Sequence, residues 1–260
     1  MCIRDRLATV LLVGVLRLGI DGAIVATGAG WAGVLVIMLP FMLAHGGLRF
    51  RRDIAWNLLT FGVPMVGSVI SFWILQLSDR ELLLHILGPV KGPPVIASYS
   101  VAYSLGTVLS TLIISPFNLA WPTTMYAVAR RSDAARVYRL VFRYFALTLL
   151  FAAFAISLLS TLLLDVLFPR SYHSAALVIP IIALSIVFYG AYLMFLTGTS
   201  IRRLTVLATA YMTAAALANV GLNVLLIPRF EAMGAAASTL IVYALLALVA
   251  YIVNRRIYPI

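Results

Sequence analysis

The stretch 175–198 reads AALVIPIIALSIVFYGAYLMFLTG and contains no charged side chain. It is longer than the roughly 20 apolar residues that cross a bilayer's hydrocarbon core of about 30 Å, because an α-helix rises about 1.5 Å per residue. Six similar stretches lie in the chain, separated by short charged loops. The sequence therefore predicts seven membrane spans, at Ala23–Ala44, Ile54–Leu77, Val95–Leu119, Tyr144–Leu164, Ala175–Gly198, Leu204–Ile227 and Met233–Val253.

The composition agrees with a chain that is solvated by lipid. Hydrophobic residues make up 63% of the 260 residues and charged residues only 10%, whereas soluble domains carry about 25% charged residues. In lipid only helices and closed barrels satisfy all backbone hydrogen bonds internally, and the alternating pattern of barrel strands does not occur in the sequence. We therefore predict an all-α fold, a polytopic transmembrane helical bundle.

The net charge of +11 would suggest a nucleic-acid partner for a soluble protein. Here the basic residues lie in loops between spans, where the positive-inside rule accounts for them, so no nucleic-acid binding is predicted. The single cysteine, Cys2, cannot form an internal disulfide, and no Cys/His cluster has metal-ligand spacing. We expect no catalytic residue, no metal and no cofactor, and the protein is not expected to be an enzyme.

Loop charges alternate along the chain and predict its orientation. One set of alternate loops carries 12 arginines, namely Arg49, Arg51, Arg52, Arg130, Arg131, Arg136, Arg139, Arg143, Arg202, Arg203, Arg255 and Arg256. The opposite set carries five basic residues, namely Arg17, Arg80, Lys91, Arg170 and Arg229. Cytoplasmic loops are enriched in basic residues, so the first set and the C-terminus are predicted to be cytoplasmic.

The N-terminus departs from this pattern. The apolar run Leu7–Leu16 is too short to span comfortably and is expected to be a truncated span, with a signal peptide as the alternative. Residues 1–6 look like a translated adapter remnant, so they are expected to be a non-native start. The natural protein is then expected to extend upstream.

Several short motifs follow one another in order along the chain. Residues 77–80 read LSDR, and residues 99–106 read YSVAYSLG. The pattern Asn219-x3-Asn223-x4-Pro228 follows, and residues 234–236 read GAA. In these motifs the chain resembles the polysaccharide-biosynthesis family of O-antigen flippases, within the multidrug/oligosaccharidyl-lipid/polysaccharide exporter superfamily. Relatives usually have glycine between Pro228 and Gly234, where this chain has Glu231.

The resemblance implies a transporter with two six-helix lobes around a central cavity. Residues 7–48 would be the last two helices of the first lobe, and residues 49–260 would be the six-helix second lobe. The implied function is a flippase of the bacterial inner membrane that moves polyprenyl-diphosphate-linked oligosaccharides outward for lipopolysaccharide and other surface polysaccharides. The expected partners are membrane lipid, the lipid-linked substrate and the missing N-terminal lobe.

Such a substrate needs cations for its diphosphate, and arginine binds phosphate bidentately. Polar groups that accept sugar hydroxyls are expected from the hydroxyl-rich span Val95–Leu119. The candidate substrate-binding residues are Arg80, Arg143, Asp79, Tyr99, Ser100, Tyr103 and Asn118.

Each candidate also has a purely structural interpretation. Arg143 anchors a helix at the interface, and Asp79 with Arg80 forms an outer-end ion pair or a helix cap, with a role in gating as the alternative. The hydroxyls of Val95–Leu119 hydrogen-bond neighbouring helices. Asn219 and Asn223 share a helical face, and an interhelical hydrogen bond is expected to satisfy them.

Two other functions stay open. An ion-coupled drug or metabolite antiporter of the same superfamily would favour an acidic residue buried within a span, and the sequence places none there. A membrane-bound polysaccharide polymerase or glycosyltransferase would need a large external loop with catalytic groups. The longest predicted outer loop, Ser78–Pro94, holds few candidates.

Overall fold

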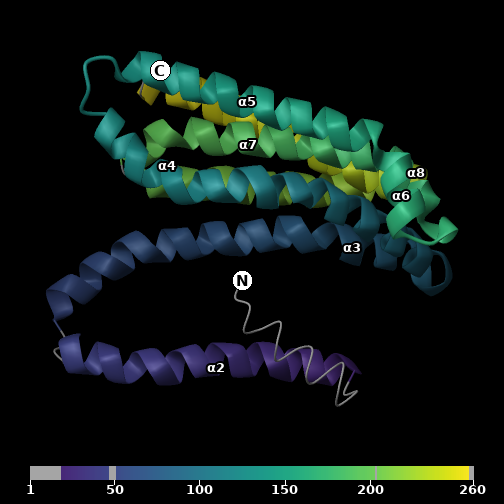
Figure 1. Cartoon of the computed structure of the whole chain (residues 1–260), viewed down its shortest axis with the longest axis horizontal. Helices are drawn as coiled ribbons and strands as arrows, with labels where there is room; N and C mark the ends of the chain where they lie inside the picture. Colours follow the sequence, from purple (N-terminus) through teal and green to yellow (C-terminus); the bar gives the residue numbers. More distant parts are fainter. Residues whose placement is uncertain (1–18, 47–50, 203, 258–260) are drawn as a thin grey trace. The chain divides into compact units, whose positions relative to one another are not determined.

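A computed structural model describes residues 19–46, 51–202 and 204–257, and every regular element in these ranges is helical. Figure 1 shows their arrangement. The elements are α2 (Gly19–Gly46), α3 (Arg52–Leu109), the π-helix η2 (Ser110–Ile114), α4 (Ser115–Val128), α5 (Ala134–Leu158), α6 (Ser160–Leu167), the 3-10 helix η3 (Arg170–Leu177), α7 (Ile179–Ile201) and α8 (Thr205–Ile257). The predicted all-α class is confirmed.

Among the described residues, five helical segments are long and apolar enough to cross a membrane, as expected of a polytopic membrane protein. They are Ile24–Ala44, Val66–Val128, Ala134–Leu158, Ile179–Ile201 and Val206–Arg256. The chain divides into two compact units, one ending at Leu58 and the other running from Leu59 to Ile260. The predicted non-native start and the short segment Leu7–Leu16 lie outside the described residues.

Helix α3 consists of two helices joined at Gly88, where φ is 76° and ψ is 177°. A φ in this range favours glycine, and Pro89 disfavours a helical conformation in the residue before it. The chain reverses at this point, because Tyr99 hydrogen-bonds to Asp79 and Tyr103 hydrogen-bonds to Gln76. From Tyr99 to Tyr103 the residue number rises, while that of the partner falls from Asp79 to Gln76. The two halves of α3 therefore form an antiparallel hairpin.

Helix α8 is a second hairpin. Its break is at Glu231, with φ 49° and ψ −125°. Gly234 lies so close to the opposing half that a Cβ there would stand 2.5 Å from the carbonyl oxygen of Leu226. On either side of the break, Asn223 and Thr239 both hydrogen-bond to Asp79. The two halves of α8 therefore pack against each other and against α3.

The structure corrects two predicted boundaries. The prediction of an outer loop at Ser78–Pro94 is wrong, because these residues are helical on both sides of the break at Gly88. Their charged side chains suggested a solvated loop, but Asp79 is buried by the hairpin instead. Helix α5 begins at Ala134, within the basic run, and not at Tyr144, so basic residues and apolar span form one continuous helix.

Polar side chains join the first half of α3 to the first half of α8. The pairs are Ser68–Thr209, Ser71–Thr213 and Ser78–Asn219, with oxygen–oxygen distances of 3.0, 2.9 and 3.0 Å. The partner numbers rise together, so these two half-helices run parallel. Hydrogen bonds of this kind hold helices together in lipid, where apolar burial contributes little to their association.

Helix α7 is the centre of the second unit, and it packs against both α8 and α5. Its buried side chains include Ile179, Ile182 and Ile186. Pro180 stands in its first turn, where the missing N–H costs no helical hydrogen bond. Figure 1 shows α4, α5 and α7 running side by side.

The break in α8 gives a first prediction. Glu231 is exposed and is the one non-glycine residue with positive φ in the described part of the chain. Such a conformation costs a side chain on the order of 1 kcal/mol, so Glu231→Gly should stabilise the protein by about 1 kcal/mol. Thermal unfolding in detergent measures the gain, and Glu231→Ala, which keeps a Cβ, is the control. Equal stability of the two variants would contradict the strain.

Candidate functional site

The candidate site centres on Asp79, which is only 1% exposed. It lies nine positions before the break at Gly88, or about 13 Å along the helix at about 1.5 Å per residue. The prediction of an outer-end ion pair or helix cap is therefore wrong, because Asp79 is an interior residue of α3. Among the ion pairs of the described residues, none involves Asp79. The sequence-based statement that no acidic residue is buried within a span is wrong as well.

Three neutral groups donate hydrogen bonds to the Asp79 carboxyl group. Tyr99 Oη lies 2.5 Å from Oδ2, and Thr239 Oγ1 lies 2.9 Å from the same oxygen. Asn223 Nδ2 lies 2.6 Å from Oδ1. The donors come from both halves of α8 and from the second half of α3, so one carboxyl group ties two hairpins together.

The amide groups of Asn219 and Asn223 form the next layer. Asn223 Nδ2 also donates to Asn219 Oδ1 at 2.9 Å, and Ser78 Oγ donates to that oxygen at 3.0 Å. Both asparagines are fully buried. The interhelical hydrogen bonds predicted for them are present. Asn223 Oδ1 and Asn219 Nδ2 have no hydrogen-bond partner within the described residues.

Arg80 contacts residues of both halves of the α3 hairpin. Its Nε donates to Ser100 Oγ at 3.2 Å, and its Nη1 donates to the carbonyl oxygen of Gln76 at 3.1 Å. The guanidinium carbon lies 4.9 Å from the ring centroid of Tyr103 and 5.9 Å from that of Tyr99. Cation–π contacts of this kind hold an arginine in place without neutralising it.

Polar side chains line a cavity of about 170 Å³ next to this group. From the hydroxyl-rich segment come Tyr103, Thr107, Ser110, Ser115 and Asn118, and Gln76, Tyr189 and Tyr243 complete its polar wall. The π-helix η2 begins at Ser110, on the wall of the cavity. Other hydroxyls bond between helices, since Ser174 Oγ lies 3.0 Å from Ser98 Oγ. The hydroxyls of this span therefore divide between the wall of a cavity and hydrogen bonds to neighbouring helices, and sugar binding by the cavity stays a prediction.

The predicted site residues fall into two groups. Asp79, Arg80, Tyr99, Ser100 and Tyr103 form one connected group, and Asn118 lies on the adjoining cavity. Arg143 lies apart from them, on an exposed part of α5.

Asp165 of α6 lies 3.1 Å from His173 Nε2, and no ion pair with an arginine is found for it among the described residues. Arg17 lies outside the described residues.

Sequence reasoning missed Gln76, Thr239, Tyr189 and Tyr243 as members of the site. The available signal was weak, because each is one of a few polar side chains scattered through an apolar span. Ser238 and Thr239 do stand together in the last span, and both are buried. Only the hairpin fold shows that Thr239 faces Asp79.

Asp133 is an exposed acidic residue in the loop before α5. Arg131 Nε and Nη2 donate to the two carboxylate oxygens of Asp133 at 2.8 and 2.9 Å. This pairing lowers the pKa of Asp133 below its ordinary value. Asp133 therefore stays ionised at neutral pH and offsets one of the arginine charges of the basic run.

The arrangement supports reversible binding of a small positive charge. An ionised carboxyl group among neutral donors in an interior site is costly, and a proton or a small cation would relieve that cost. No histidine, cysteine or further acid joins Asp79 in a metal-binding group among the described residues.

Comparison with protein families, with curated proteins and with solved structures returned no match for this chain.

Proposed function

We propose that this chain is part of a flippase for polyprenyl-diphosphate-linked oligosaccharides in the bacterial inner membrane, driven by reversible binding of a proton or cation at Asp79. The observation that carries the proposal is the buried Asp79 carboxyl group, held by Tyr99, Asn223 and Thr239 at the junction of two hairpins. No covalent chemistry is involved, and the chain acts as a transporter and not as an enzyme.

Coupling follows from the position of Asp79. Its partners lie on three half-helices, so a change in its charge alters the hydrogen bonds that hold them together. Ionisable groups in the interior of membrane proteins commonly serve proton or ion pathways because their burial is expensive. Binding of a positive charge would favour one packing of the hairpins and its release would favour the other, which is the differential affinity that a driven transporter needs.

The substrate class follows from Arg80 and the adjoining cavity. Arg80 is a cation fixed by Ser100 and Tyr103 without an acidic partner among the described residues, and a diphosphate is a suitable anion for it. The hydroxyl and amide groups of the cavity, including Thr107, Ser110 and Asn118, suit sugar hydroxyls. The resemblance to oligosaccharide flippases supports the same substrate.

We place seven crossings in the membrane. With 58 and 53 residues, α3 and α8 are each long enough for two crossings of roughly 20 residues. The breaks at Gly88 and Glu231 would then lie outside, and the basic run 130–143 would lie in the cytoplasm. The parallel pairing of the first halves of α3 and α8 supports this, since an even number of crossings separates their starts.

Cysteine labelling tests the topology. In a Cys2→Ser background, Ser132→Cys and Lys91→Cys place single thiols on exposed positions of the two opposite sets of loops. A membrane-impermeant maleimide should label position 91 from the periplasmic side and position 132 only from the cytoplasmic side of sealed vesicles. Labelling of both positions from one face would refute the seven-crossing arrangement.

A second function, an ion-coupled drug or metabolite antiporter, is also favoured by Asp79. Its burial supplies the interior acidic residue that such an antiporter needs. The two functions differ in their use of Arg80, because a cationic drug has no need of a fixed cation beside its path. Arg80→Gln should therefore impair movement of a diphosphate lipid and leave export of a cationic dye unchanged.

Transport is tested with the protein as its source genome encodes it, including any upstream helices. The protein is reconstituted into vesicles with a fluorescent polyprenyl-diphosphate oligosaccharide, and a proton or sodium gradient is imposed. Faster flipping with one of the gradients supports the proposal and identifies the coupled ion. No flipping with either gradient, together with gradient-driven export of a cationic dye, would establish the antiporter instead.

A further inference from the structure

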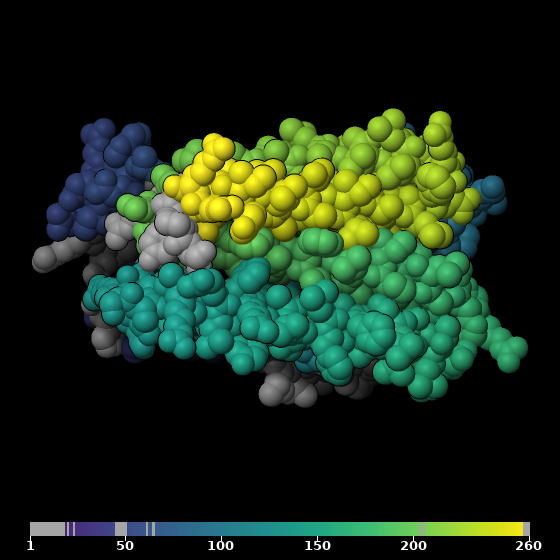
Figure 2. Space-filling view, turned by 90° about the horizontal axis from the view of Figure 1, so that it is seen from above, coloured from purple at the N-terminus to yellow at the C-terminus, as the bar shows by residue number. Residues whose placement is uncertain are grey.

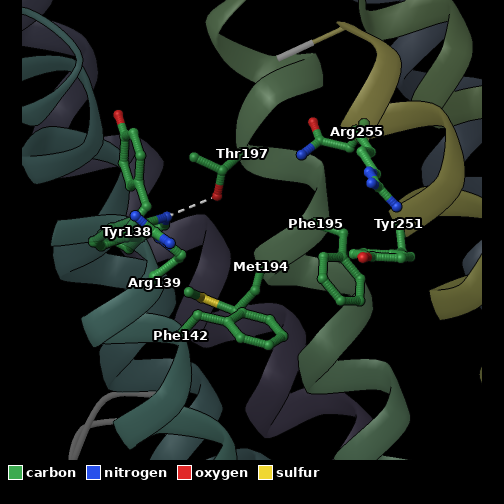
Figure 3. Close-up of a pocket in the computed structure, with 10 residues that line it drawn as sticks. Tyr138, Arg139, Phe142, Met194, Phe195, Thr197, Tyr251 and Arg255 are labelled. Atoms are coloured by element: carbon green, nitrogen blue, oxygen red, sulfur yellow. Dashed lines mark hydrogen bonds between the residues drawn. The ribbon is translucent and has the colours of Figure 1, made fainter. Parts of the chain in front are cut away.

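A second pocket, of about 430 Å³, lies where α4, α5, α7 and the last turns of α8 meet. It shares no lining residue with the cavity beside Tyr103. Figure 3 shows Arg139 of α5 on one side of this pocket and Arg255 of α8 on the other, with Thr197 and Met194 of α7 between them. Its volume is within the range of about 300–1,000 Å³ that is usual for ligand pockets.

The charge of this pocket has one sign. Among the described residues, no acidic side chain lines it, and neither Arg139 nor Arg255 forms an ion pair. Arg139 Nε donates to the carbonyl oxygen of Ala135 at 3.2 Å, which positions its guanidinium group. Arginines that line a pocket supply donors for charge-assisted hydrogen bonds to a phosphate.

Asn254 provides a second, independent observation. Its side chain lines the pocket and is only 5% exposed, and its Oδ1 has no hydrogen-bond partner in the described part of the chain. A buried acceptor without a donor is costly, so it favours a ligand that brings a hydroxyl group. The pocket therefore combines cations for a phosphate with an acceptor for a neighbouring hydroxyl.

An aromatic strip lies one helical turn away from the arginines. Phe142 follows Arg139 by three positions on α5, and Tyr251 precedes Arg255 by four on α8, so each aromatic shares a face with its arginine. Phe195 of α7 connects them, with ring centroids 4.9 Å from Phe142 and 5.1 Å from Tyr251. Phe142 lies farther than Arg139 from the start of α5, and Tyr251 lies farther than Arg255 from the end of α8. The aromatic side chains therefore lie toward the apolar parts of these two helices.

Helices α5 and α8 pack mainly against α7, and Figure 2 shows them on either side of it. A molecule with a phosphate at its head and an apolar tail would place the phosphate between Arg139 and Arg255 and the tail along the aromatic strip. Basic pockets between helices on the cytoplasmic side are known to suit anionic lipid headgroups.

We propose that this pocket binds one anionic phospholipid of the phosphatidylglycerol type. Its phosphodiester contacts Arg139 and Arg255, its glycerol hydroxyl donates to Asn254 Oδ1, and one acyl chain lies on Phe142, Phe195 and Tyr251. The unpartnered Asn254 Oδ1 matches the hydroxyl group of a small polyol headgroup. The bound lipid holds α5 and α8 onto α7, and the proposal stands whether or not the chain is a flippase.

Native mass spectrometry of the purified chain, delipidated and then titrated with phosphatidylglycerol, tests this site. The wild type should bind one phosphatidylglycerol at saturation and unfold at a higher temperature with it than with phosphatidylcholine. Arg139→Gln with Arg255→Gln should weaken binding by about tenfold or more and remove the thermal gain. The matched control, Arg170→Gln with Arg229→Gln, removes the same charge from two exposed arginines that do not line the pocket and should bind as the wild type does.

Competition experiments distinguish a phospholipid headgroup from a free phosphate or a diphosphate lipid as the ligand of this pocket. Glycerol phosphate without acyl chains should displace the lipid only weakly, and polyprenyl-diphosphate oligosaccharide should not displace it at equal concentration. Equal weakening in both double variants would reduce the site to general surface charge and overturn the proposal. Three further results would also overturn it. They are displacement by glycerol phosphate alone, stronger binding of the polyprenyl lipid, and a wild type that does not prefer phosphatidylglycerol over phosphatidylcholine. The last comparison needs no variant, so it stays decisive if a variant fails to fold.

Discussion

Asp79→Asn is expected to reduce gradient-driven flipping by about tenfold or more, to the rate seen without a gradient. Asparagine keeps the size of the side chain and an acceptor oxygen for Tyr99 or Thr239, so the hairpins should remain folded. It has no ionisable group, so it cannot exchange a proton or hold a cation through a negative charge. On the proposed mechanism, the variant should therefore lose its response to the gradient while remaining folded. Flipping in reconstituted vesicles, with and without a proton or sodium gradient, measures the change.

The matched control is Asp165→Asn. Asp165 is exposed at the end of α6, beside His173, so its neutralisation should leave the driven rate unchanged. If Asp79→Asn protein unfolds at the wild-type temperature but does not respond to the gradient, the variant has lost coupling and not its fold. A normal gradient-driven rate in Asp79→Asn would remove this carboxyl group from the mechanism, and the function proposed from it would fail with it.

The position of Asp79 also shows how far sequence reasoning reaches. Length and apolarity predicted membrane-crossing helices, because bilayer thickness fixes how many apolar residues a helix needs. The same rule ended the span at Leu77, since it treats every charged residue as solvated. Asp79 and Arg80 follow directly, yet α3 continues through them to the break at Gly88. Burial of a charged residue depends on partners on other helices, and no single span contains that information.

The asparagines were predicted more successfully than the aspartate. Their spacing of four places both on one helical face, and apolar surroundings require partners for both. The identity of those partners was beyond the sequence, because Ser78 and Asp79 are more than a hundred residues away from them. Similarly, Tyr99, Ser100 and Tyr103 were selected for their hydroxyls, and the hairpin at Gly88 determines that they meet Gln76, Asp79 and Arg80.

Close packing at Gly234 has the largest expected effect on stability. A Cβ at this position would lie 2.5 Å from the carbonyl oxygen of Leu226, 2.7 Å from its carbonyl carbon and 3.0 Å from the nitrogen of Ile227. All three atoms belong to the backbone, so no side-chain rotation relieves the clash. The two halves of α8 must separate, which would also move Thr239 away from Asp79. Gly234→Ala should therefore destabilise the protein by about 2–3 kcal/mol.

Gly221 provides the matched control for Gly234, because it lies in the first half of the same helix and a Cβ there would meet no atom within 4 Å. Alanine favours a helix over glycine by roughly 0.5–1 kcal/mol, so Gly221→Ala should be neutral or stabilising. The two variants make the same chemical change in one helix, and only the distance to Leu226 separates them. Thermal unfolding in detergent compares them directly. Equal stability would mean that the halves of α8 do not approach closely at Gly234, and the contact between Thr239 and Asp79 would then lose its support.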